Sequence, residues 1–139
     1  MNMKQRILPR EARLAALVVV HLGVSVVHAI AHVRAPAVLS HAALSFVITI
    51  VLVGPIVGLI MQRTAYPRGG AWVIAATLAG AFWFGLISHF LILGSDNITH
   101  VPETWRALFE TTAVLVAVTE FFGSGVAVWC AMREGTSGR

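Results

Sequence analysis

The 139-residue sequence contains one cysteine, Cys130, and only 12% charged residues. A single cysteine excludes an intramolecular disulfide and a metal site built from several thiolates. The sequence has ten lysine and arginine residues and six aspartate and glutamate residues. The basic residues lie outside the apolar stretches and form no continuous patch. Nucleic acid is therefore not an expected partner.

The short motifs of several common enzyme sites are also missing. The sequence contains no nucleophile elbow, phosphate-binding loop, dinucleotide-binding fingerprint or HExxH zinc helix. The sequence therefore gives no support for hydrolysis by those routes and predicts no catalytic residue.

Apolar residues, by contrast, make up 58% of the sequence. They form four long stretches, residues 14–33, 37–61, 71–94 and 105–131. Each stretch reaches or exceeds the roughly 17 to 20 residues that a helix needs to cross a bilayer. The stretches are continuous runs, whereas the strands of a membrane barrel alternate between apolar and polar residues. We therefore predict an all-α integral membrane protein, a single domain over residues 1–139 that forms a four-transmembrane-helix bundle of two helical hairpins in a lipid bilayer.

The basic residues predict the orientation of this bundle. They gather before the first stretch, between the second and third, and after the fourth, at Lys4, Arg6, Arg10, Arg13, Arg63, Arg68, Arg133 and Arg139. The two other loops, one of them the turn around Pro36, carry only Arg34 and Arg106. The positive-inside rule then places both termini in the cytoplasm and the loop of residues 95–104 outside. We predict a multi-pass protein of the plasma, or inner, membrane.

Histidines and acidic residues inside these stretches are the strongest functional signal. Each stretch has one such residue about four or five positions inside its predicted outer end: His28, His41, His89 and Glu110. At a rise of about 1.5 Å per residue, these four residues lie in one layer. His32 follows His28 by four positions and shares its helical face, and His100 lies in the outer loop just above. The predicted metal ligands are His28, His32, His41, His89, His100 and Glu110.

Four further ionisable residues are predicted to support this layer or to form a proton path toward it. Asp96 and Glu103 lie in the outer loop, while His21 and Glu120 lie near the middle of the first and fourth stretches. A pair formed by His21 and Glu120 is equally explained as a structural hydrogen bond. Ionisable groups inside a bilayer are costly, so they usually face the bundle interior and mark a functional site.

Several functions fit this pattern. Imidazole and carboxylate ligands favour iron, copper(II), zinc or manganese, so the first expectation is a membrane metalloprotein, such as an oxidoreductase that acts on a lipid-soluble small molecule or on dioxygen. The alternative cofactor is haem b, held by His28 and His89 in an electron-transfer subunit. Further alternatives are a metal or proton transporter, which would require a homo-oligomer, and an accessory subunit of a larger membrane complex whose histidines are structural.

Overall fold

The computed structural model describes residues 10–35, 37 and 39–134. This part of the chain is helical and contains no strand, and four helices are long and apolar enough to cross a membrane: Glu11–Arg34, His41–Gln62, Pro67–Leu91 and Glu103–Arg133. The prediction of an all-α chain with four helices that are long and apolar enough to span a membrane is confirmed for this part of the chain. Four residues used in the orientation and turn predictions lie outside the described residues, namely Lys4, Arg6, Pro36 and Arg139.

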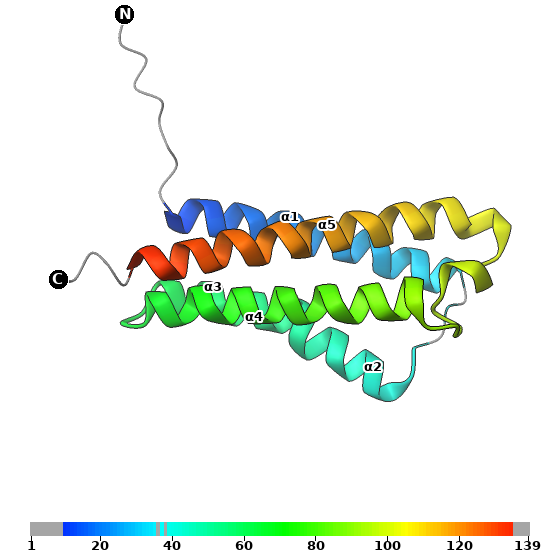
Figure 1. Ribbon diagram of the computed structural model, residues 1–139, viewed down its shortest axis with the longest axis horizontal. Coiled ribbons are helices and arrows are strands. Elements are labelled where there is room, and N and C mark those ends of the chain that lie inside the picture. Colours follow the sequence, from blue (N-terminus) through cyan, green and yellow to red (C-terminus); the bar gives the residue numbers. More distant parts are fainter. Residues whose placement is uncertain (1–9, 36, 38, 135–139) are drawn as a thin grey trace, which may run out of the picture.

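The four spans lie along the long axis of the molecule, and each runs antiparallel to the one before it in the chain (Figure 1). In chain order the elements are α1 (Arg10–Arg34), α2 (His41–Phe46), the π-helix η1 (Val47–Val53), α3 (Gly54–Gln62), α4 (Pro67–Leu86), the π-helix η2 (Ile87–Leu91), the 3-10 helix η3 (Ile98–His100) and α5 (Glu103–Glu134). The start of α1 and the end of α5 lie at the same end of the bundle. We call the opposite end, where the loops before α2 and α5 lie, the distal end.

The second span is helical throughout, from His41 to Gln62, but a π-helix next to a proline breaks its α-helical winding. In an α-helix the carbonyl of Val51 would accept a hydrogen bond from the amide of residue 55, but Pro55 has no N–H. The span is wound as the π-helix η1 up to Val53, and the Nε2 atom of His21 on α1 donates to the Val51 carbonyl at 3.2 Å. This hydrogen bond ties α1 to the middle of the second span.

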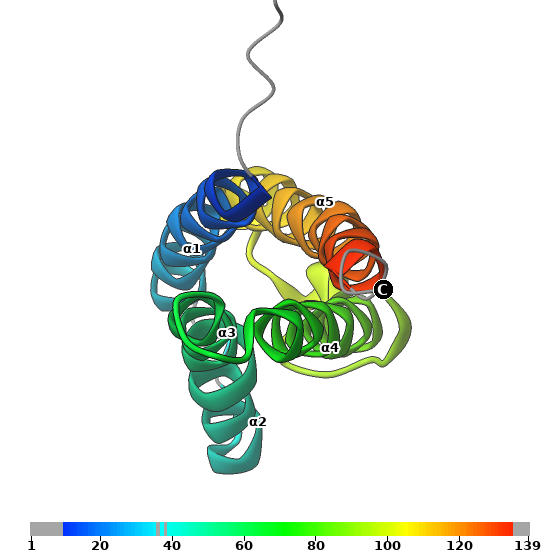
Figure 2. The same ribbon diagram turned by 90° about the vertical axis from the view of Figure 1, so that its left-hand side faces the viewer.

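Beyond this bond the second span follows two directions. Near the termini, α3 packs closely against α4, since Gly58 and Gly70 let the two backbones approach. Toward the distal end, α2 leans away from the other helices, which the end-on view shows clearly (Figure 2). The bundle is therefore tight near the termini and open between α1 and α2.

The interior of the bundle is apolar near the termini, where Leu14, Ile74 and Leu78 are fully buried in one cluster. The exterior is apolar as well: Val20, Ile60 and many other large apolar side chains of the spans are exposed. A protein surrounded by water rarely exposes a continuous surface of this kind. The exposed apolar surface is therefore the one expected of helices that contact lipid.

Candidate metal centre

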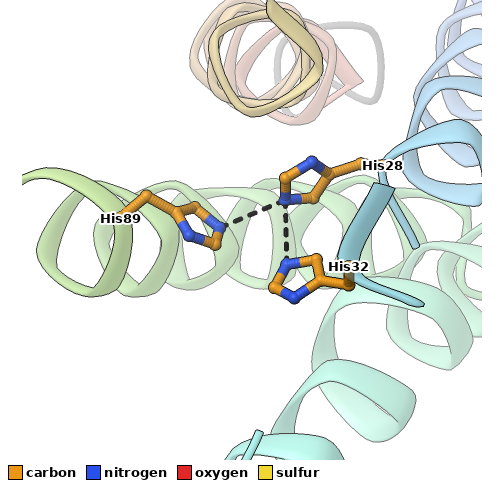
Figure 3. A group of neighbouring side chains, drawn as sticks. All are labelled: His28, His32 and His89. Atoms are coloured by element: carbon orange, nitrogen blue, oxygen red, sulfur yellow. Dashed lines mark hydrogen bonds between the residues drawn. The ribbon is translucent and has the colours of Figure 1, made fainter. Parts of the chain in front are cut away.

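Three histidines converge at the distal end of the bundle (Figure 3). His28 and His32 lie one turn apart on α1, and His89 faces them from η2 at the end of the third span. The Nε2 atom of His28 lies 3.2 Å from the Nε2 atom of His32 and 3.2 Å from that of His89. One ligand nitrogen from each residue lies within 4.8 Å of the other two. These distances define a compact group, which we call the histidine triad.

The hydrogen bonds of the Nδ1 atoms assign the tautomer of two of these rings. The Nδ1 atom of His28 lies 2.9 Å from the hydroxyl oxygen of Thr112, whose own hydrogen is donated to the Leu108 carbonyl at 2.8 Å. His28 is therefore the donor in the first of these bonds. The Nδ1 atom of His89 lies 3.0 Å from the Asp96 carbonyl, which can only accept. Both rings carry their hydrogen on Nδ1.

His32 follows the same pattern. Its Nδ1 atom lies 3.3 Å from the Ala37 carbonyl, which can only accept. The same atom lies 3.2 Å from a carboxylate oxygen of Asp96, a distance that suits an ion pair, although this oxygen forms no hydrogen bond. When each ring carries its hydrogen on Nδ1, the Nε2 atoms of all three histidines turn bare lone pairs toward one another. The two contacts drawn between these nitrogens in Figure 3 are hydrogen bonds without repulsion only when one ring of each pair carries its hydrogen on Nε2 instead. A cation placed among the three lone pairs would turn this repulsion into bonding.

Asp96 supports the triad from the loop that follows η2. Its two carboxylate oxygens lie 3.2 Å from Nδ1 of His32 and 3.3 Å from Nδ1 of His89. Burial raises the pKa of this carboxyl to about 6, and the neighbouring His32 opposes part of that increase. Neither oxygen forms a hydrogen bond, so Asp96 acts on the two rings through its charge. A carboxylate beside the far nitrogen of an imidazole makes the other nitrogen a better metal ligand.

An aromatic side chain covers the triad from α5. The ring centroid of Phe109 lies 5.1 Å from that of His28, 4.8 Å from that of His32 and 5.3 Å from that of His89. Phe109 is fully buried. The three imidazoles therefore sit against an apolar wall, which excludes water from that side.

A cavity of about 550 Å³ lies on another side of the triad. The three histidines and Asp96 form its distal end, and its walls are mainly apolar residues of α1, α2, η1 and α4. Glu120 and Ser25 also line it. The triad is thus covered on one side and accessible on the other, which leaves room for a further ligand on a bound ion.

The other three predicted ligands lie outside the triad, and all three are exposed. His41 is the first residue of α2, which leans away from the bundle. The Nδ1 atom of His100 lies 2.6 Å from the Gly94 carbonyl within the loop. Glu110 is adjacent in sequence to buried Phe109, but successive helical residues point in different directions, so it projects outward.

The residues predicted to support the layer also separate in the structure. Asp96 contacts the triad, as described above, whereas Glu103 is exposed at the start of α5. His21 forms its hydrogen bonds with Val51 and, at 3.3 Å, with the hydroxyl oxygen of Thr119, rather than with Glu120. Its contacts are those of a residue that joins helices.

Sequence reasoning missed Thr112 and Phe109. Both lie one helical turn or less from Glu110, at the predicted depth, but a threonine and a phenylalanine in an apolar stretch carry no signal of their own. Ser25, which lines the cavity, is inconspicuous for the same reason.

The chain was compared with models of protein families, with curated proteins and with solved structures, and none of them matches it.

Proposed function

We propose that this chain is a multi-pass membrane protein that binds one transition-metal ion through the Nε2 atoms of His28, His32 and His89. The observation that carries the proposal is the arrangement of the Nδ1 atoms, each of which lies within 3.3 Å of an oxygen that can accept its hydrogen. With the hydrogens on Nδ1, the metal-binding nitrogens are unprotonated, and one nitrogen from each ring lies within 4.8 Å of the other two. Metal-bound histidines in proteins almost always have such a partner on the far nitrogen.

The distances suit a small ion. Two imidazole nitrogens bound to one tetrahedral ion at about 2.0–2.1 Å lie about 3.3 Å apart, close to the 3.2 Å found twice in the triad. The remaining pair, His32 and His89, must contract when both bind the same ion. Imidazole ligands without thiolate suit zinc, copper(II) and iron, with manganese less favoured.

The cavity beside the triad argues for a working centre rather than a structural one. Structural zinc sites are closed by four protein ligands, whereas catalytic sites keep a position for water or substrate. Three histidines supply three ligands, and the fourth position faces the cavity. An iron or copper ion there would suit an oxidoreductase acting on dioxygen or on a lipid-soluble molecule, and zinc would suit polarisation of an oxygen group.

The same geometry argues against the haem alternative. A bis-histidine haem requires its two axial imidazoles on opposite faces of a wide flat ring. The Nε2 atoms of His28 and His89 are 3.2 Å apart, and His32 and Phe109 pack against the same two rings. A macrocycle between them would displace both neighbours, so a bare ion is the better occupant.

The test is elemental analysis by mass spectrometry of detergent-purified protein without a histidine tag, with an absorption spectrum of each sample. We expect one metal ion per chain and no Soret band. His28→Ala and His89→Ala should each abolish stoichiometric metal, while the exposed distal histidines provide matched controls in His41→Ala and His100→Ala, which should retain it. Full metal content in both triad variants, or no metal in the native protein after reconstitution, would refute the proposal and favour structural histidines.

We also propose that the triad end faces the outside of the plasma membrane, because the loops at the other end carry more arginine and lysine. A reporter enzyme that is active only outside the cytoplasm, fused after residue 139, should be inactive. The same reporter inserted in the loop of residues 95–102 should be active, and the opposite pattern would reverse the orientation.

A further inference from the structure

The cavity beside the triad opens sideways, between α1 and the second span. Four apolar residues line it and are also exposed: Val26 (57%) and Val33 (82%) on α1, and Leu44 (45%) and Ile48 (46%) on α2 and η1. All four lie within helices long enough to cross a membrane. The opening is therefore at a depth where hydrocarbon, rather than water, would surround the protein. The lean of α2 away from α1 accounts for the gap (Figure 2).

Besides Asp96 at the triad, whose two carboxylate oxygens are buried without a hydrogen bond, two polar side chains that line the cavity have an unpaired atom. Glu120 is 2% exposed, and its Oε2 atom is buried without a hydrogen bond. Ser25 is 8% exposed, and its hydroxyl oxygen is likewise buried and unpaired. Buried polar groups are nearly always hydrogen-bonded, so an unpaired carboxyl and hydroxyl on one cavity indicate a missing polar partner.

The positions of these groups set the dimensions of that partner. Glu120 follows Thr112, which holds His28, by eight residues on α5, or about 12 Å along the helix. Apolar side chains, among them Val47, Leu52 and Phe84, line the space between the two ends. The cavity thus offers a polar contact at the inner end, an apolar middle, and the triad at the distal end.

We propose that the cavity binds an uncharged, bilayer-soluble molecule with an apolar body and a hydroxyl or carbonyl group, which enters between α1 and α2 and pairs with Glu120 and Ser25. This inference rests on the proposed function and extends it, since it names the class of molecule that reaches the open position of the metal centre. The ligand is uncharged because an unpaired charge inside a bilayer is costly. No arginine or lysine is among the described residues that line the cavity, so an anion would have no cationic side chain to pair with at the inner end, beside Glu120.

The experiment uses photoreactive dodecanol, in phosphatidylcholine vesicles containing the full chain, and identifies the labelled residues by mass spectrometry. A photoreactive dodecane without the hydroxyl is the matched probe. We expect dodecanol to label cavity residues such as Val47 and Leu52, and the hydrocarbon to label only the exposed faces of the helices. Equal labelling of the cavity by both probes, or by neither, would overturn the proposal.

Two pairs of variants sharpen this result. Ala29 lines the cavity at its exposed edge and Val27 is exposed without lining it, so Ala29→Trp should block cavity labelling while Val27→Trp should not. Glu120→Leu should reduce it roughly fivefold, the scale of one lost hydrogen bond, and Glu120→Gln, which keeps polar atoms there, should reduce it less. If either Ala29→Trp or Glu120→Leu left cavity labelling unchanged, the assignment would be refuted.

Metal content, measured on the same samples, separates this inference from the proposed function. Cavity labelling by dodecanol in a protein that binds no metal would sustain the ligand site and refute the metal centre. A protein that binds metal but shows no hydroxyl-dependent labelling would sustain the metal centre and refute the ligand site. Crosslinks that instead join α2 of one copy to α1 of another would identify a second chain as the occupant and overturn the inference.

Discussion

The Nε2 atoms of His28 and His89 lie 3.2 Å apart, although the two residues are 61 positions apart in the sequence and belong to different spans. The hydrogen of each ring is directed the other way, toward Thr112 from His28 and toward Asp96 from His89. The fold thus holds two unprotonated nitrogens at close range, with a third from His32 beside them. Single substitutions can distinguish the residues that contribute to metal affinity from those that contribute only to helix packing.

Thr112→Val should weaken metal binding without abolishing it. Valine has the shape of threonine but cannot accept the hydrogen bond from Nδ1 of His28, so the ring loses its fixed orientation. Loss of such a partner typically costs about 10–100-fold in metal affinity. A zinc titration against a chromophoric chelator measures the change, and the protein should still reach one ion per chain at saturating metal.

The matched control for this variant is Thr119→Val, on the same helix and beside His21 rather than His28. It should leave zinc affinity unchanged. Equal weakening in both variants would mean that the effect reflects altered packing of α5, and the role assigned to Thr112 would be wrong.

Asp96→Asn should also weaken metal binding, by a similar factor of about 10–100. The carboxylate lies 3.2 Å and 3.3 Å from the Nδ1 atoms of His32 and His89, and its charge makes the opposite nitrogens stronger ligands. Asparagine keeps the size of the side chain and removes that charge. The same titration applies, with Glu103→Gln as the control because Glu103 is an exposed acidic residue near the same end. Unchanged affinity in Asp96→Asn would exclude an electrostatic contribution.

Counting residues along a helix predicts how deep a side chain lies in the membrane but not which way it points. Depth along a helix follows from the rise per residue, and the residue count alone places His28 and His89 at similar levels. Direction around a helix changes by about 100° per residue, so the end of a span must be located almost to the residue to predict which way a side chain points. Glu110 and Phe109 illustrate the difference: both have the predicted depth, and only Phe109 faces the triad.

Two further features were not predictable from the pattern of residues. The π-helix η2 contains His89 and alters the direction of its side chain relative to a regular α-helix, and nothing in an apolar run signals such a segment. The lean of α2 depends on the break at η1 and on packing with the other spans. The four spans themselves were predictable because apolar length alone determines them.

His21→Leu should lower stability and leave metal binding intact. Nε2 of His21 donates to the Val51 carbonyl at the break of the second span, and leucine removes this bond while keeping the site apolar. Leucine also removes the bond between Nδ1 of His21 and Thr119, and two lost hydrogen bonds correspond to about 1–3 kcal/mol in the free energy of unfolding. Thermal unfolding in detergent measures the loss, and zinc titration of the same sample provides the comparison. Weaker zinc binding with unchanged unfolding would instead connect His21 to the metal centre.

Gly58→Ala should destabilise the tight end of the bundle. A Cβ atom at this position would lie 2.5 Å from Cγ1 of Ile74 and 2.8 Å from the carbonyl oxygen of Gly70. A backbone oxygen cannot move aside as the end of a side chain can, so α3 and α4 must separate, at a cost of about 1–3 kcal/mol. Thermal unfolding followed by circular dichroism should show a clearly lower midpoint.

Gly23→Ala is the control, since a Cβ there meets nothing within 4 Å and alanine is the better helix former by up to about 1 kcal/mol; its midpoint should be equal or higher. If Gly58→Ala unfolds at the same temperature as Gly23→Ala, the two helices tolerate the extra methyl group and the close approach of α3 and α4 does not limit stability.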